Sequence, residues 1–180
     1  MVSQFVSSHH VNLLNDLDFI FPEGTHAIGR LDKNSEGLLL LTTNKKITRL
    51  LFQGTKPHSR TYLVQVNGSI TDESIEKLRN GVSFIICNGM EYISKSCKVK
   101  RAEPYPDNRI GSDKIYHSST WISIEICEGK YHQVRKMVKA VGHKCLRLIR
   151  ISIEDIELNN LLPGEVYEME EALFFKKLKL

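Results

Sequence analysis

Residues 27–44 read AIGRLDKNSEGLLLLTTN and place one acidic side chain, Asp32, between two apolar runs. The run after it, Gly37 to Thr43, is apolar at odd and even positions alike, which predicts a buried central strand. His26 to Leu31 predicts another strand on the other side. Asp32 therefore lies in a short connector, where a polar residue is typical of a turn that bonds its own backbone. The same place suits a carboxylate that a rigid strand end holds for chemistry.

Helical and alternating patterns extend outward from this stretch. The clearest helix begins at an N-cap, Thr71, and ends at Gly81. Trp121 to Cys127 alternates, with three isoleucines on one face. The other predicted elements are helices at 10–18, 45–52, 131–141 and 170–178, strands at 60–66, 82–86, 97–102 and 146–153, and a long surface loop at 104–119. Because several strands follow one another without a helix between them, we predict an α+β fold with a mainly antiparallel sheet.

Composition limits the broad class of protein. The chain has 180 residues, 41% of them hydrophobic and 26% charged, which is ordinary for one soluble domain. With no signal leader and no apolar run near membrane length, we expect a cytoplasmic protein without a membrane partner. The four cysteines are spaced irregularly, no CxxC or HExxH occurs, and buried or half-buried free thiols without a metal site are expected. The net charge of +4 is too mild to indicate nucleic acid, so the distribution of charge must decide.

A basic face marks the predicted helix within EGKYHQVRKMVKAVGHK, residues 128–144. One stripe of this helix is apolar. The other stripe carries His132, Arg135, Lys136, Lys139 and His143. A solvated face of an amphipathic helix is the simplest interpretation. Arg135, however, falls at the edge of the apolar stripe, and a half-buried guanidinium needs a carboxylate or phosphate partner. Asp32 is the candidate carboxylate.

An aspartate beside an arginine stays ionised in an apolar setting, because the opposite charge offsets desolvation. Such an oriented carboxylate can act as a nucleophile or a base. Asp32 and Glu36 together could also suggest a glycosidase pair, but a flexible loop fixes two carboxylates poorly. Tyr62 on the predicted strand 60–66 is either a core aromatic residue or a stacking platform for an unpaired base.

Three segments together resemble a known family. GRLDKNSEGLLLLTTN, RTYLVQV and EGKYHQVRKMVKAVGHKCLRLIRISI are similar, in this order and spacing, to motifs of the pseudouridine synthases that modify ribosomal RNA. DKNSEGLL and HSSTWISI are closest to the large-subunit members. The resemblance implies the pseudouridine synthase fold, a mixed and mainly antiparallel sheet flanked by helices with a central active-site cleft. It also implies that residues 1–180 are one catalytic domain, without an appended S4 domain and without the NKP-like strand that usually comes first in the family.

The resemblance also implies roles for individual residues. Asp32 would be the catalytic aspartate, Arg135 its ion-pair partner, and Tyr62 the ring that packs against the target uracil. Leu148 would line the same pocket, and Arg30 would aid RNA binding or displacement of the base. Further RNA contacts would come from Lys130, His132, Gln133, Lys136, Lys139 and Arg147.

The implied activity is isomerisation of a specific uridine to pseudouridine in 23S ribosomal RNA. The reaction conserves the number of bonds, so no cofactor is expected, and the target nucleotide must leave its helix to react. We expect a monomer. Two alternatives stay open at this point: a non-catalytic RNA-binding or ribosome-assembly module on the same fold, and a synthase that acts on transfer RNA.

Overall fold

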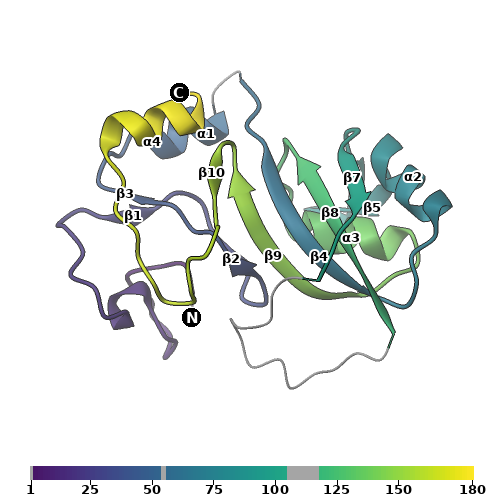
Figure 1. The fold of residues 1–180 in the computed structure, drawn as a ribbon, viewed down its shortest axis with the longest axis horizontal. Coiled ribbons are helices and arrows are strands. Elements are labelled where there is room, and N and C mark those ends of the chain that lie inside the picture. The colour runs from purple at the N-terminus through teal and green to yellow at the C-terminus, as the bar shows by residue number, and fades with distance from the viewer. Residues whose placement is uncertain (1, 54–55, 105–117) are drawn as a thin grey trace.

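The computed structural model describes residues 2–53, 56–104 and 118–180, which form a large sheet with a smaller unit beside it (Figure 1). In spatial order the sheet contains β10 (Ile156–Glu157), β9 (Cys145–Ile153), β4 (Arg60–Asn67), β8 (Ser119–Ile126) and β7 (Lys98–Arg101). All four neighbouring pairs in this order are antiparallel. A short strand, β2 (Glu36–Gly37), pairs with β9 in parallel. The predicted α+β fold with a mainly antiparallel sheet is confirmed.

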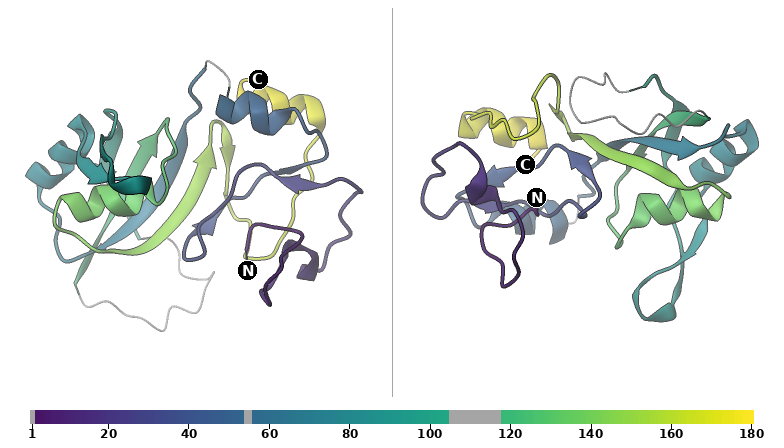
Figure 2. Two further views of the ribbon diagram at one scale, coloured as in Figure 1. Left: turned by 180° about the vertical axis from the view of Figure 1, so that it is seen from behind. Right: turned by 90° about the horizontal axis from the view of Figure 1, so that it is seen from below.

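Two helices, α2 (Asp72–Asn80) and α3 (Gln133–Ala140), cover one face of this sheet (Figure 2). The alternation of β4 and β8 turns their apolar side chains toward these helices. The resulting core includes Val64, Val66, Ile122, Ile124, Met137 and Val138. A hairpin of β5 (Ser83–Ile85) and β6 (Glu91–Ile93) packs beside α3, and a 3₁₀ turn (Cys87–Gly89) lies between its strands. The helix predicted after Thr71 is confirmed as α2. Its predicted N-cap is confirmed too, since the Thr71 side chain accepts from the Ser74 amide at 3.2 Å.

The smaller unit contains segments from both ends of the chain, which lie side by side in Figure 1. It is built from β1 (His26–Ala27), β3 (Leu41–Thr42), α1 (Ile47–Gln53), α4 (Glu171–Leu178) and a 3₁₀ turn (Leu14–Asp16). A second apolar core joins it to the sheet through Ile28, Leu38, Leu40, Ile149, Ile153 and Leu178. This arrangement puts the connector that carries Asp32 at the junction of the two units.

Several sequence predictions need correction. The single strand predicted at Gly37 to Thr43 is wrong: β2 and β3 are separate two-residue strands in different sheets. Between them the chain passes from β9, to which the Leu38 amide donates, to β1, where the Leu40 carbonyl accepts from Ile28. Of the strand predicted at 26–31 only the first two residues pair, and the helix predicted at 10–18 is a single 3₁₀ turn. The strands β6 and β10 were not predicted. The loop predicted at 104–119 lies almost wholly outside the described residues.

Candidate active site

Asp32 lies at the tip of the loop of residues 30–38, called the Asp32 loop below. The turn is closed by the Ser35 amide, which donates to the Asp32 carbonyl at 2.8 Å. The far arm of the loop is tied to β9, where the Leu38 amide donates to the Arg150 carbonyl at 2.8 Å. The Asp32 side chain is 34% exposed. The carboxylate is therefore accessible, while the backbone on either side of it is anchored.

Gly37 is the residue that allows the loop to lie on β9. A Cβ atom at this position would stand 2.3 Å from the carbonyl oxygen of Arg150 and 2.8 Å from its amide nitrogen. Both are backbone atoms, which cannot swing away as a side chain would. With its φ of +100°, this position requires glycine for its conformation as well as for space.

The first turn of α3 meets the Asp32 loop from the other side. His132 precedes the helix in the left-handed conformation, with a φ of 54°, and its Nε2 lies 3.6 Å from Asp32 Oδ1. Its ring stacks on Tyr131 with centroids 4.0 Å apart. The guanidinium of Arg135 donates to the carbonyl of Asn34. The two motifs that are about a hundred residues apart in sequence are thus in contact.

The structure brings Arg135 to the Asp32 loop but not into an ion pair with its carboxylate. Among the described residues, the one cation within 4 Å of the Asp32 carboxylate is His132, if that ring is protonated. Arg135 is half-buried, as expected from its place at the edge of the apolar stripe. A direct pair between Asp32 and Arg135 remains a prediction.

Arg150 on β9 is a buried cation of the site. Its place in the basic run that continues from the predicted helix suggests a contact with RNA phosphates, but its burial does not fit such a contact. It is 4% exposed, and it lies opposite Tyr62 in the register of β4 and β9. Burial lowers the pKa of the Arg150 guanidinium, while the nearby Tyr62 and Asp32 act in the opposite direction. An arginine remains charged under these conditions. In the sequence this residue is one of several cations near the end of the third motif, and only the strand register places it beside Tyr62.

Glu128 anchors the start of α3. Its carboxylate accepts from the Tyr92 hydroxyl at 2.5 Å, from the Lys95 amide at 3.0 Å and from the Gln133 side chain. The hydrogen bond to Glu128 raises the pKa of Tyr92 to about 12. The backbone carbonyl of Glu128 accepts from Arg60 at 3.3 Å. The hairpin β5–β6 and the strand β4 thereby hold the turn that presents His132.

The residues predicted to bind RNA differ in their exposure to solvent and in their contacts within the protein. Arg30, Lys130 and Lys139 are exposed, and Lys136 is half-buried near the Tyr131 ring. Gln133 is 4% exposed, accepts from the Lys130 amide at 2.8 Å and donates to Glu128, so its contacts are internal.

Two further predicted residues, both on β9, are also engaged within the protein. Leu148 is 3% exposed and belongs to the core against which Tyr62 packs. Arg147 makes a two-pronged contact with Glu36, with Arg147 Nη2 at 3.0 Å from Glu36 Oε2 and Arg147 Nε at 3.1 Å from Glu36 Oε1. The second carboxylate of the loop, Glu36, is therefore held by an arginine. The structure shows no such two-pronged contact for the carboxylate of Asp32 among the described residues.

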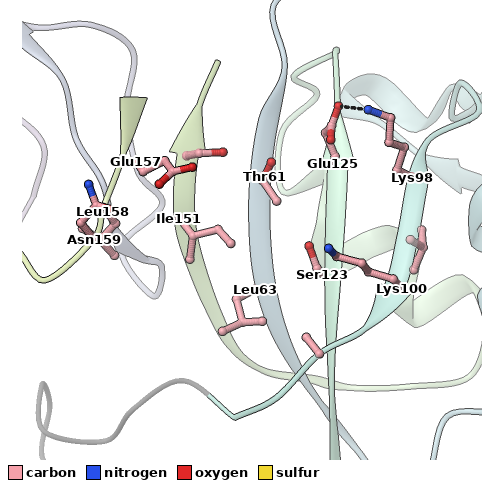
Figure 3. Close-up of a pocket in the computed structure, with 13 residues that line it drawn as sticks. Thr61, Leu63, Lys98, Lys100, Ser123, Glu125, Ile151, Glu157, Leu158 and Asn159 are labelled. Carbon is pink, nitrogen blue, oxygen red and sulfur yellow. Dashed lines mark hydrogen bonds and ion pairs between the residues drawn. The ribbon is translucent and has the colours of Figure 1, made fainter. Parts of the chain in front are cut away.

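A hollow of about 630 Å³ lies on the other face of the sheet (Figure 3). It is lined by Thr61 and Leu63 of β4 and by Ile151 of β9, which alternate with Tyr62 and Arg150 and so point away from α3. None of the predicted site residues lines it. We place the candidate chemistry at Asp32 rather than in this hollow, because the hollow lacks the predicted site residues and its Glu125 is already paired with Lys98 at 2.9 Å. A cleft at Asp32 remains a prediction.

Other chemical features can be stated for the described ranges. No helix there has both the length and the apolar character to cross a membrane. No three His, Cys, Asp or Glu side chains within them gather as a metal would need. All four cysteines are free thiols, but only Cys97 and Cys145 are half-buried; Cys87 and Cys127 are exposed, so the predicted burial is wrong for these two. What the site offers is a single accessible carboxylate, held on an anchored loop among cationic side chains, which can act as a nucleophile or a base.

Comparison with known proteins agrees with this geometry. The family model described as RNA pseudouridylate synthase matches residues 14–140, a range that includes the Asp32 loop, Tyr62 and α3. The chain belongs to this family. Its relatives include the protein named ribosomal large subunit pseudouridine synthase E of Vibrio parahaemolyticus, 35% identical over 153 residues, or 85% of this chain and 63% of the relative. The protein of the same name in Xanthomonas axonopodis pv. citri is 34% identical over 150 residues, or 81% of this chain and 76% of the relative.

A solved pseudouridylate synthase has the same fold as this family member. Its crystal structure superposes with a TM-score of 0.68 at 26% sequence identity, over 88% of this chain and 63% of that chain. The chain thus spans about two thirds or less of the length of several proteins that it matches. The pseudouridine synthase fold expected from the sequence is confirmed.

Proposed function

We propose that this protein isomerises a specific uridine to pseudouridine in large-subunit, 23S ribosomal RNA. The observation that carries the proposal is the position of Asp32, an accessible carboxylate on a loop seated on β9 and met by the first turn of α3. Relatives named ribosomal large subunit pseudouridine synthase E support the choice of RNA. We infer that residues 1–180 act as one catalytic domain, as a monomer, in the cytoplasm where ribosomal RNA is found.

The reaction detaches uracil from C1′ of the ribose, turns it, and rejoins it through carbon. Because the number of bonds is conserved, the chemistry calls for no oxidant and no external energy source. It needs one fixed carboxylate near the ribose, which either attacks C1′ or removes a proton from C2′. Asp32 is the group that fits, since Glu36 is held by Arg147.

The remaining residues have supporting tasks in this proposal. Tyr62 packs against the uracil, and the apolar core behind it keeps water from the intermediate. Extruding the target nucleotide from its helix costs roughly a few kcal/mol. Contacts of exposed cations such as Lys130 and Lys139 with phosphates offset this cost. Arg30, two residues before Asp32 and exposed, helps to displace the base in this proposal.

The experiment that tests the activity incubates the protein with unmodified 23S RNA and maps pseudouridine by carbodiimide treatment and reverse transcription. Wild type should create a stop at one or a few defined uridines, and Asp32→Asn should create none. Asp72→Asn is the matched control, because Asp72 is an exposed aspartate on α2, paired with Arg101 at 2.7 Å. Stops that persist in Asp32→Asn would refute the role of Asp32. Stops on transfer RNA alone would refute the ribosomal substrate.

The basic helix is tested by salt dependence. Lys139→Ala should weaken RNA binding and reduce the slope of log affinity against log salt by about one, while turnover at saturating RNA stays near wild type. Lys77→Ala, an exposed lysine of α2, is the control. A large loss of saturated turnover in Lys139→Ala would instead place Lys139 among the reacting groups.

A further inference from the structure

The side chain of Arg150 holds both arms of the Asp32 loop. Its Nε donates to the Leu38 carbonyl at 2.8 Å, and its Nη1 lies 3.5 Å from the Arg30 carbonyl. These two carbonyls stand on either side of Asp32. The backbone carbonyl of Arg150 also accepts from the Leu38 amide. Loss of this guanidinium would therefore remove one tie from each arm of the loop, while the backbone bond between Leu38 and Arg150 stays in place.

The same guanidinium lies against Tyr62. The two residues are cross-strand partners in β4 and β9, so their side chains stand on one face of the sheet, close enough to interact directly. The register of these strands shifts between Thr61 and Tyr62, which sets the point from which the ring projects. Arg150 thus touches both the strand of the predicted base-stacking ring, at Tyr62 itself, and the loop of the predicted catalytic acid.

One donor of Arg150 is not satisfied. Its Nη2 is buried and has no hydrogen-bond partner among the described residues. A buried donor without a partner costs about 1–3 kcal/mol, and a buried charge costs more unless it is paired. A side chain kept for stability alone would be expected to satisfy all its donors or to be apolar. Nη2 thus adds nothing to stability, whereas Nε and Nη1 contact the loop on either side of Asp32.

We propose that Arg150 is a positioning residue that fixes Asp32 relative to Tyr62, at the expense of some stability. The proposal rests on the proposed function for its activity readout, and it assigns Arg150 no contact with RNA. Since displacement of a reacting group by about 1 Å can reduce the rate by 10²-fold, loss of this hold should act on the chemical step rather than on RNA binding.

The test compares Arg150→Met with Arg79→Met. Arg79 is the matched control, because its Nε also donates to a backbone carbonyl, that of Val99 at 2.8 Å, but on α2 away from the site. In Arg150→Met, kcat on saturating RNA should fall about 100-fold with KM within about twofold of wild type. Its melting temperature should fall no further than that of Arg79→Met, whose kcat should stay at the wild-type value. Arg150→Lys, which keeps the charge and one donor, should recover part of the rate.

Other results would overturn the proposal. A folded Arg150→Met with wild-type kcat does so, and so does a rise in KM without a change in kcat. If Arg150→Met does not fold, Arg150→Lys decides, and unchanged kcat in that variant is the contrary result. If wild type proves inactive on every RNA, the proposed function fails. The positioning role of Arg150 is then tested separately by ¹⁹F NMR of fluorotyrosine-labelled protein. The signal assigned through Tyr62→Phe should then shift in Arg150→Met and not in Arg79→Met; an unchanged signal overturns the positioning role.

Discussion

Gly37→Ala is the most direct test of how the Asp32 loop is held. The new methyl group would stand 2.3 Å from the Arg150 carbonyl oxygen, so the loop must lift from β9. The left-handed conformation of an alanine costs about 1–2 kcal/mol. Lifting also breaks the bond from the Leu38 amide to Arg150, worth about 0.5–1.5 kcal/mol, and the bond from the Arg150 guanidinium to the Leu38 carbonyl, worth about 1.5–3 kcal/mol. The free energy of unfolding should therefore fall by about 3–6 kcal/mol, a large part of the total stability of a domain.

Gly68→Ala separates conformation from contact. Gly68 also has a positive φ, of +69°, but a Cβ there would meet no atom within 4 Å. This variant should lose only about 1–2 kcal/mol. Urea unfolding followed by circular dichroism gives both values, and pseudouridine formation should fall sharply in Gly37→Ala alone. Equal losses of stability in the two variants would show that packing of the loop on β9 adds nothing to the free energy of unfolding, and would refute the reasoning.

Three other predictions concern groups outside the loop. The hydrogen bond to Glu128 raises the pKa of Tyr92 to about 12. The contribution of this bond to stability is therefore complete below pH 10 and is lost as the pH rises through 12. The difference in phenolate absorbance between wild type and Tyr92→Phe should have its midpoint near pH 12 rather than 10. Thr71→Ala should lower the free energy of unfolding by about 1 kcal/mol in a urea titration, through loss of the α2 cap, and an unchanged midpoint would contradict this. Burial raises the pKa of Cys97 to about 11, so iodoacetamide at pH 8 should alkylate the exposed Cys87 first, as peptide mass spectrometry would show; equal rates would argue against that burial.

Local signals in the sequence were enough for the parts of the fold that are stabilised locally. The helix α2 follows from its cap at Thr71 and its stop at Gly81, which act within a few residues. The alternation of β4 and β8 also gave the correct faces, since Val64, Val66 and the three isoleucines of β8 point into one core. Strands of two or three residues such as β6 and β10 carry no such pattern, because their pairing is set by the neighbours they meet.

The Asp32 region contains contacts that could not be predicted from the sequence. Leu38 and Leu40 are buried as predicted, but residues 36–38 pack on β9, a contact between residues 112 apart that no local pattern indicates. The place of Arg150 beside Tyr62 could not be predicted from the sequence for the same reason. Its importance depends on being opposite Tyr62, and the register includes shifts that the sequence does not announce.

The parallel pairing of β2 with β9 also has a consequence for the order of assembly. Residue 38 leaves the ribosome 112 residues before its partner, which at usual elongation rates is on the order of 5–20 s. Throughout that time β9, the strand on which the Asp32 loop packs, is absent. We expect a nascent chain that ends before residue 145 to build the hairpin β5–β6 and the helix α2 while the centre of the protein stays unformed, so that catalytic competence arrives with one of the last strands to be translated.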